Sequence, residues 1–430
     1  MIIGLMSGTS LDGLDIALCK VSGDGLATSL KVERFMSVRY SAEFLAIVRP
    51  LFANPSAPLD EVTRANAWVA REHARMLIGV LNNWGIDSDH VDILASHGQT
   101  IFHAPRTLPL SQHRNNSIEP ALASATLQIG DGDHLAFLTK ILTLSDFRQK
   151  HIAANGEGAP LVPYADYLLF SSTSENRILV NIGGIANFTY IPSSASFNQV
   201  VSADSGPGNT LMDALIQNVS TLTANKSVVN QLPNIDKLYD SNGDFALKGK
   251  VDVLLLNVLL GQLNNNALNE EQSISVNKST GQETFNINFV HRALETLYRE
   301  NTGNINTSAL IDYLSTSKQA FYNLLATLNL FTAKTIGNAI ANLSISKREY
   351  ENTVIYLSGG GVHNPVLVAN IRECAAHLSV KSCNDLGIDA DAKEAALFAV
   401  LANQTLFGNS SVFANDNGIP QTAFGKISLP

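Results

Sequence analysis

Three segments of the chain combine glycines with hydroxyl residues, and two of them also contain acidic residues, a mixture suited to binding phosphate groups. The first extends from Gly4 to Gly13 and contains Gly8, Thr9, Ser10 and Asp12. Small residues let backbone amides approach an anion, hydroxyls donate to phosphate oxygens, and a carboxylate can hold a hydrated magnesium ion. We therefore expect a phosphate and metal loop, in which Asp12 holds Mg2+ through water. An ordinary hairpin turn is the alternative, although three hydroxyls and one acid exceed what a turn needs.

The second segment, from Ala203 to Asp213, follows an apolar run and precedes a predicted helix. Open α/β sheets bind ligands where a strand ends ahead of a glycine turn and a helix N-terminus. Asp204 is therefore a candidate general base, with Gly206 and Gly208 beside it. The position of Asp204 also allows a simpler role, in which it only caps the helix.

The third segment, from Ser358 to Asn364, again joins a predicted strand to glycines and then to a helix. Gly359 and Gly360 would let a nucleotide approach the backbone closely. The pattern indicates a nucleotide-binding turn.

Longer polar side chains at other strand ends form a set suited to a polyhydroxylated, acidic substrate. Ser96 and His97 follow one predicted strand, Asp146 and Arg148 follow another, and Glu394 lies in a helical stretch. Simpler roles remain open for them. His97 would then be a structural histidine, Asp146 and Arg148 a local ion pair, and Glu394 a solvated helix residue.

The apolar pattern predicts the elements that must position these residues. Strands from Ile2 to Leu5 and from Leu14 to Val21 flank the first polar turn, and a helix from Glu61 to Trp84 ends at Gly85. Further strands are expected at 91–95, 127–129, 141–144, 178–182, 200–203 and 354–357, and further helices at 320–341 and 392–405. This alternation is typical of an α/β fold.

The stretch from Arg177 to Pro192 repeats the plan of the opening hairpin, with two apolar runs around a small polar turn. Two copies suggest two related lobes. We expect a first lobe at 1–145 and a second at 146–389, and a last helix near 390–430 that packs back on the first lobe.

Composition narrows the class of protein. The 430 residues carry a net charge of −9 without a basic run, which argues against a nucleic-acid partner. No leader or long apolar run predicts export or membrane insertion. Three cysteines without metal-ligand spacing fit a reducing compartment, so we expect a cytoplasmic protein. Walker A, zinc-protease and nucleophile-elbow motifs are missing. The sequence leaves a homodimer open.

A series of short segments occurs in a characteristic order: 6–15 (MSGTSLDGLD), 96–100 (SHGQT), 127–130 (LQIG), 146–148 (DFR), 156–163 (GEGAPLVP), 181–187 (NIGGIAN), 204–209 (DSGPGN), 278–281 (KSTG) with Glu283 and Phe285, 359–361 (GGG) and 394–395 (EA). This series resembles that of the anhydro-N-acetylmuramic acid kinases and spans nearly the whole chain.

The resemblance implies the two-lobed fold of sugar kinases, actin and heat-shock chaperone ATPases (ribonuclease H-like), with ATP in the cleft between the lobes. It also implies the reaction. ATP, water and 1,6-anhydro-N-acetylmuramic acid would become ADP and N-acetylmuramic acid 6-phosphate during peptidoglycan recycling.

By their places in the motifs, the residues receive roles within this resemblance. Asp204 would activate the water that attacks the anomeric carbon. The sugar would be held by Ser96, His97, Asp146, Arg148 and Glu394. The nucleotide and its metal would be bound by Gly8, Thr9, Ser10, Asp12, Asn181, Gly183, Gly184, Gly206, Gly208, Gly359 and Gly360.

Two segments depart from the family pattern. Arg148 is followed by Gln149, Lys150 and His151, where many relatives continue with Arg-Arg-Asp, and residues 155–158 read NGEG instead of the commoner GGQG. Both departures concern contacts around Arg148. Two other functions remain as alternatives: an ordinary hexose or amino-sugar kinase, in which Asp204 deprotonates the sugar hydroxyl, and an actin-like nucleotide-binding protein without a small acceptor.

Overall fold

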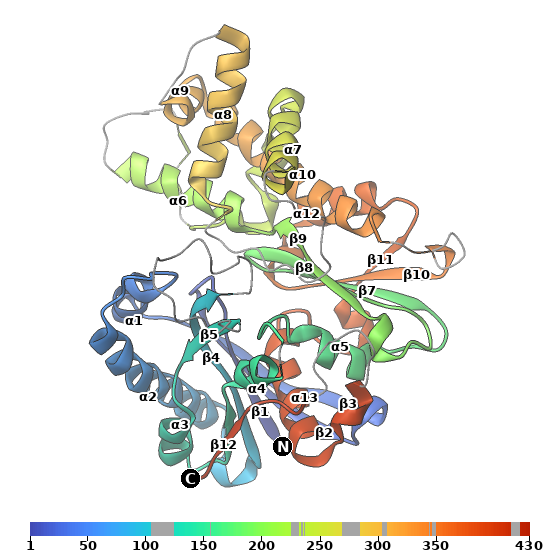
Figure 1. The fold of residues 1–430 in the computed structure, drawn as a ribbon. Coiled ribbons are helices and arrows are strands. Elements are labelled where there is room, and N and C mark those ends of the chain that lie inside the picture. The colour runs from blue at the N-terminus through green and yellow to red at the C-terminus, as the bar shows by residue number, and fades with distance from the viewer. Residues whose placement is uncertain are drawn as a thin grey trace, which may run out of the picture. The chain divides into compact units, whose positions relative to one another are not determined.

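The computed structural model describes residues 1–104, 124–154, 156–224, 232–233, 235, 237–268, 284–302, 308–343, 345, 350–413 and 422–430. The chain forms two compact units. The first comprises residues 1–177, 191–201 and 383–430, and the second comprises residues 178–190 and 202–382. Both units combine a sheet with helices (Figure 1), so the predicted α/β class is confirmed.

The first unit includes residues 146–177, which the sequence analysis assigned to the second lobe. Here α5 (Val162–Phe170) packs against α13 (Lys393–Phe407), and α13 also packs on the first sheet. Compactness does not by itself define which parts move together. The division into functional lobes at residue 145 therefore stays a prediction.

The sheet of the first unit is mixed. Within the described residues it has seven strands in the order β12-β6-β4-β1-β2-β3, and β5 pairs with β4. The bounds are β1 Ile2–Ser7, β2 Gly13–Ser22, β3 Ser29–Arg39, β4 Ile93–Ala104, β5 Ala125–Ile129, β6 Thr143–Ser145 and β12 Lys426–Ser428. β1 is antiparallel to β2 and parallel to β4, which is parallel to β6. The predicted opening hairpin is confirmed.

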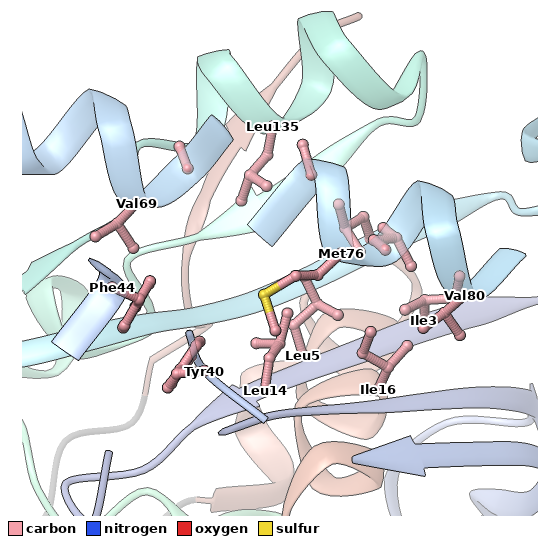
Figure 2. Close-up of a cluster of buried hydrophobic side chains, with 14 of the residues drawn as sticks. Ile3, Leu5, Leu14, Ile16, Tyr40, Phe44, Val69, Met76, Val80 and Leu135 are labelled. Atoms are coloured by element: carbon pink, nitrogen blue, oxygen red, sulfur yellow. The ribbon is translucent and has the colours of Figure 1, made fainter. Parts of the chain in front are cut away.

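Alternate residues of β1 and β2 face opposite sides of this sheet, as the period of two along a strand requires. Ile3, Leu5, Leu14 and Ile16 belong to the core cluster that α2 (Leu59–Trp84) covers (Figure 2). The remaining helices of this unit are α1 Ala42–Val48, α3 Gly132–Thr139 and α4 Phe147–Ala153.

The helix α2 forms where the sequence predicts it. Its apolar residues recur on one face and are buried, among them Val69, Leu77 and Val80. Gly85 ends it in the left-handed conformation with φ +67°, in which its N–H bonds back to Leu81 and Asn82.

The opposite face of the sheet is covered by α13, which lies directly on the backbone of β1. A Cβ built on Gly4 would lie 1.8 Å from the carbonyl oxygen of Ala395. Any side chain at position 4 would therefore push the first turn of α13, including Glu394, away from the sheet.

The second unit is built on a five-stranded sheet in the order β11-β10-β7-β8-β9. The strands are β7 Asn176–Ile182, β8 Ile185–Ile191, β9 Val201–Pro207, β10 Thr353–Ser358 and β11 Ser379–Ser382, and the helices are α6 Thr210–Ala224, α7 Val253–Leu268, α8 Ile287–Thr302, α9 Ala309–Ser315, α10 Lys318–Ala341 and α12 Pro365–Cys374. The second predicted hairpin is β7 with β8. The largely buried α10 packs against α6, α7, α9 and α12.

Two predicted strand ends were placed too early. The strand expected to stop at residue 95 continues as β4 to Ala104, and the one expected to stop at residue 203 continues as β9 to Pro207. Polar residues continue both strands because pairing satisfies backbone groups: β4 lies between β1 and β6, and the edge strand β9 pairs with β8. The edge strand β3 was not predicted, since the charges of Lys31, Glu33 and Arg34 interrupt its apolar pattern.

Among the helices of the described residues, none is long and apolar enough to cross a lipid bilayer. The three cysteines all lie in described parts of the chain, and none of them forms a disulfide there.

Candidate functional site

The polar turn between β1 and β2 presents its hydroxyl and acidic side chains to solvent. Thr9, Ser10 and Asp12 are exposed, whereas Leu11 is buried and adopts the left-handed conformation with φ +55°. The N–H of Leu11 donates to the Gly8 carbonyl at 3.3 Å. The Ser10 hydroxyl donates to Asp12 Oδ1 at 2.8 Å. The buried Leu11 thus anchors a turn whose polar groups remain accessible to a ligand.

The donor set of this turn fits magnesium bound through water. Mg2+ usually keeps several waters and takes one or two carboxylates together with substrate phosphates. Asp12 supplies one exposed carboxylate. Within the described ranges, no cluster of three or more histidine, cysteine or acidic residues could hold a metal ion. A metal at this turn would therefore need phosphate and water ligands besides Asp12.

Ser96 and His97 lie inside β4 at a β-bulge, and not in a loop after a strand. Leu5 pairs with Ser96 and Ser7 pairs with Gln99, so two residues of β4 face one residue of β1. Gly98 makes this bulge with φ +70°, a conformation that glycine adopts without strain. A bulge turns side chains away from the regular alternation.

The bulge brings His97 into contact with Arg148 of α4. The Nε and one terminal nitrogen of Arg148 lie 3.1 and 3.0 Å from His97 Nε2. A guanidinium only donates, so Nε2 must be an acceptor, and the Nδ1–H donates to the Gly98 carbonyl at 2.9 Å. Burial lowers the pKa of His97 to about 3, and the charge of Arg148 lowers it further in the same direction. His97 is therefore a neutral acceptor that orients Arg148.

This assignment makes a prediction about pH. Because the pKa of His97 is lowered to about 3, the imidazole should stay neutral as the pH falls from about 8 to about 5. Nitrogen chemical shifts in an NMR titration should remain those of a neutral ring protonated at Nδ1. A titration midpoint for His97 near 6.5, the ordinary value, would contradict the assignment.

Arg148 keeps donors available after these contacts. A second terminal nitrogen donates to the Gly158 carbonyl at 2.9 Å, and each terminal nitrogen carries a further N–H. Burial lowers the pKa of Arg148 to about 10, whereas the nearby charge of Glu394 raises it. Even at that pKa the guanidinium is charged at neutral pH. The structure thus brings His97 and Arg148 into contact, with Glu394 near enough for its charge to act on Arg148.

Asp146 has a different partner from the one considered in the sequence analysis. It precedes α4 in the left-handed conformation, with φ +54°, and its Oδ2 lies 2.5 Å from Lys426 Nζ. Lys426 belongs to β12, which pairs with β6 immediately before Asp146. A pair with Arg148 was the simpler role considered for Asp146, and the ion pair with Lys426 takes its place.

Asp15 is an acidic residue near the polar turn to which the sequence analysis gave no role. Burial raises its pKa to about 6; a hydrogen bond from Ser37 lowers it, and the charges of Asp12, Glu394 and Asp391 raise it further. The charges of these three carboxylates therefore act on Asp15 within the first unit. Asp15 stands in the segment MSGTSLDGLD, and that motif is the signal in the sequence that could have pointed to it.

In the second unit, the turn between β7 and β8 is bound to the start of α6. The N–H of Gly208 donates to the Gly184 carbonyl at 2.8 Å, and the N–H of Asn209 donates to the Gly183 carbonyl at 2.9 Å. The Thr210 hydroxyl also donates to the Gly184 carbonyl. These bonds use N–H groups at a helix start and fasten two glycine segments to each other.

Asp204 lies within β9 and is half-buried. The hydroxyl of the next residue, Ser205, donates to the Ala186 carbonyl of β8 at 3.0 Å and holds this part of β9 in the sheet. Because α6 begins at Thr210, its N-cap position is not Asp204. A capping role is therefore excluded by position. Gly206 follows with φ +136° against Thr335 of α10.

The third glycine segment meets the end of β7. A Cβ on Gly359 would lie 2.5 Å from Asn181 Oδ1, and the Ser358 hydroxyl donates to the Val180 carbonyl at 3.2 Å. A Cβ on Gly360 would meet no atom within 4 Å. The backbone there borders open space, as a nucleotide contact requires.

The candidate residues thus form two sets, one in each unit. The first unit gathers the polar turn with Ser96, His97, Arg148 and Glu394, while Asp146 is paired with Lys426. The second unit gathers Asp204 and the glycine segments that begin at Asn181, Gly206 and Gly359. Residues 278–281 and 283 of the motif series, and Asn155, lie outside the described residues.

Comparisons with the sequences of known proteins agree with the motif series. Solved structures match at low scores: hexokinase from Schistosoma mansoni with glucose has a TM-score of 0.40 and 10% identity over 93% of this chain and 84% of that chain. Among sequences, the anhydro-N-acetylmuramic acid kinase of Pseudoalteromonas atlantica is 43% identical and covers 100% of this chain and 96% of its own length. That of Clostridioides difficile is 34% identical, with 99% and 97% covered. The sequence model described as Anhydro-N-acetylmuramic acid kinase matches residues 1–423, and the chain therefore belongs to this family.

Proposed function

We propose that the protein phosphorylates 1,6-anhydro-N-acetylmuramic acid with ATP. In the overall reaction, water opens the anhydro bridge and the γ-phosphoryl group goes to O6, which yields ADP and N-acetylmuramic acid 6-phosphate. The observation that carries the proposal is the family match over residues 1–423, together with full-length relatives of that name. The product belongs to the recycling of peptidoglycan.

Asp204 is the residue we propose as the general base. Its half-buried carboxylate lies within β9, shortly before the strand ends at Pro207 and ahead of the start of α6, and a carboxylate there can accept a proton. It would take a proton from the water as the new bond to the anomeric carbon forms. The O6 atom, released from that carbon, would accept the phosphoryl group.

The polar turn from Gly8 to Asp12 would bind the phosphates of ATP. Exposed hydroxyls of Thr9 and Ser10 supply donors, and Asp12 would hold Mg2+ through water. Bound there, the metal would offset negative charge on the phosphates. The turn at Gly183–Gly184 and the open backbone at Gly360 would contact the rest of the nucleotide.

The sugar would be recognised from the first unit. Arg148 has two unused N–H groups that match the fork of a carboxylate, and the substrate carries one in its lactyl group. His97 orients the guanidinium as a neutral acceptor. It therefore adds no charge that would compete with the substrate carboxylate for Arg148. Ser96, Asp146 and Glu394 would hold hydroxyl and amide groups of the ring.

We expect Arg148→Ala to raise the KM for the anhydro sugar more than it lowers kcat. The guanidinium would bind the carboxylate equally in the ground and transition states, and losing such a contact raises KM. A charge-assisted bidentate contact corresponds to about a tenfold to hundredfold effect. Steady-state kinetics with varied sugar would measure it, and an unchanged KM would show that Arg148 is not the carboxylate ligand.

The substrate itself is tested by incubating the protein with Mg-ATP and single sugars. 1,6-Anhydro-N-acetylmuramic acid should give a phosphorylated product by mass spectrometry, whereas N-acetylmuramic acid and N-acetylglucosamine should not. Phosphorylation of the reducing sugars would indicate an ordinary amino-sugar kinase. ADP release without any acceptor would indicate an actin-like ATPase.

We also propose that this reaction takes place in the cytoplasm, where ATP is available as the phosphoryl donor. The partner is then a small amino sugar, with no role for nucleic acid or a membrane. Cell fractionation would test the location. Sedimentation of the purified protein would distinguish a monomer from the homodimer that the sequence leaves open.

A further inference from the structure

Four buried polar side chains form a continuous hydrogen-bonded chain beneath the polar turn. We call them the Gln99 chain: His73 of α2, Tyr40 after β3, Ser7 of β1 and Gln99 of β4. Tyr40 Oη lies 3.0 Å from His73 Nε2 and 2.5 Å from Ser7 Oγ. Ser7 Oγ is bonded in turn to Gln99 Oε1. None of the four has a role in the reaction proposed above.

The chemistry of each group allows only one direction of hydrogen-bond donation along the Gln99 chain. Gln99 Oε1 can only accept, so the single hydroxyl hydrogen of Ser7 is used there. Tyr40 must then donate to Ser7, and His73 must donate to Tyr40 from Nε2. Burial lowers the pKa of His73 to about 3, so the donor is a neutral ring.

The chain ends on the carbonyl group that closes the polar turn. Gln99 Nε2 donates to the Gly8 carbonyl at 3.3 Å and to the Thr100 carbonyl at 3.1 Å. The Gly8 carbonyl also accepts the N–H of Leu11 at 3.3 Å. A carbonyl oxygen has two lone pairs, and the turn and Gln99 occupy both. Rotation of the Gly8 peptide would break both bonds.

The bulge at Gly98 places Gln99 in this position. With regular pairing from Leu5 and Ser96 onward, Ser7 would face Gly98, whereas the observed partner of Ser7 is Gln99. The same bulge directs His97 to Arg148. The bulge in β4 therefore determines both the contact of His97 with Arg148 and the support that Gln99 gives to the polar turn.

The Tyr40 ring is itself held firmly. It stacks on Phe44 with a centroid distance of 3.7 Å, within the core cluster that Figure 2 shows between β1, β2 and α2. The Tyr40 N–H donates to the Asp12 carbonyl at 3.3 Å, so Tyr40 contacts the other end of the turn as well. The packed core thus supports the turn at both Gly8 and Asp12.

We propose that the residues of the Gln99 chain are positioning residues that hold the turn from Gly8 to Asp12 in the conformation that binds the phosphates of ATP. The inference rests on the proposed function, because it takes that turn as the phosphate site. The Gln99 chain would not contact the substrate and would act through the Gly8 carbonyl.

Two variants test it in the full-length protein. Tyr40→Phe keeps the packed ring and removes the hydroxyl, which interrupts the chain. Gln99→Met keeps the shape and removes all three hydrogen bonds of the amide, to Ser7, Gly8 and Thr100. Loss of one such bond corresponds to a several-fold effect. We expect the KM for Mg-ATP to rise about fivefold in Tyr40→Phe and at least about tenfold in Gln99→Met, while the KM for the sugar changes by less than about twofold.

A matched control is the second buried tyrosine–histidine pair of the first unit. Tyr164 Oη lies 3.1 Å from His151 Nε2, and His151 Nδ1 accepts the N–H of Gly158 at 2.8 Å. Tyr164→Phe removes the same hydroxyl from a buried tyrosine, and we expect it to leave the KM for Mg-ATP unchanged. Calorimetry with a non-hydrolysable ATP analogue measures the affinity for nucleotide without turnover. The wild type and the variants should rank in the same order as by their KM for Mg-ATP.

The outcomes separate this inference from the proposed function. A wild-type protein that does not phosphorylate the anhydro sugar would refute the function. An active wild type whose affinity for nucleotide is unchanged in Tyr40→Phe and Gln99→Met would refute the positioning role alone. An equal loss in Tyr164→Phe would also refute it, because the effect would then come from general destabilisation.

Discussion

Asp204→Asn should abolish most turnover and leave folding and ATP binding intact. The amide keeps the shape of the side chain in β9 but cannot accept the proton of the attacking water. Removal of a general base costs about a hundredfold to ten-thousandfold in kcat. Rapid-quench measurement of ADP, together with circular dichroism and calorimetry for ATP, would establish the pattern. Near-normal turnover in this variant would exclude Asp204 as the base.

The same mechanism predicts where the oxygen of water is found in the product. In heavy-oxygen water, the label should appear at the anomeric hydroxyl of N-acetylmuramic acid 6-phosphate when the reaction is quenched before exchange. The phosphate should carry none. Label confined to inorganic phosphate would mean plain ATP hydrolysis. This result would contradict the proposed reaction even if Asp204 proved essential.

Lys393→Met should strongly destabilise the first unit. Lys393 Nζ lies 3.0 Å from Asp166 Oδ1, and both side chains are almost completely buried, at 1% and 0% exposure. Burial lowers the pKa of Lys393, but the charge and hydrogen bond of Asp166 together with the charges of Cys383 and Glu394 outweigh burial, so the net pKa is raised. Removing the cation leaves a carboxylate in the interior without its lysine, which costs about 3–5 kcal/mol. Urea unfolding followed by circular dichroism would measure the loss.

The double variant Lys393→Met with Asp166→Leu is the control for this effect. A buried ion pair that is replaced by apolar residues of similar volume often changes stability little. We therefore expect the double variant to regain most of the lost free energy of unfolding. If the free energy of unfolding of Lys393→Met lies within about 1 kcal/mol of the wild-type value, the pair is not buried away from water, which would contradict the structure. Because Glu394 follows Lys393 in α13, the sugar affinity of the single variant should fall as well.

The local elements around the site follow from the sequence. Two apolar runs around a turn of small residues specify the β1–β2 hairpin, and the spacing of buried positions with Gly85 at the end specifies α2. The glycine segments at Gly183, Gly208 and Gly359 were likewise recognisable, because close backbone approach requires small residues. These features depend on residues close to one another in the sequence, so the sequence alone determines them. The ordered motifs also identify the family from the sequence.

The partners of the polar side chains were decided only by the tertiary structure. The chain separations are 33 residues from Ser7 to Tyr40, 92 from Ser7 to Gln99 and 280 from Asp146 to Lys426. No periodicity within a segment encodes such pairs, because they depend on strand order, on the bulge at Gly98, on the packing of α2 against the sheet and on the pairing of β12 with β6. For Ser7, Tyr40 and Gln99, burial then makes the choice specific, since a polar group removed from water must find a partner within reach.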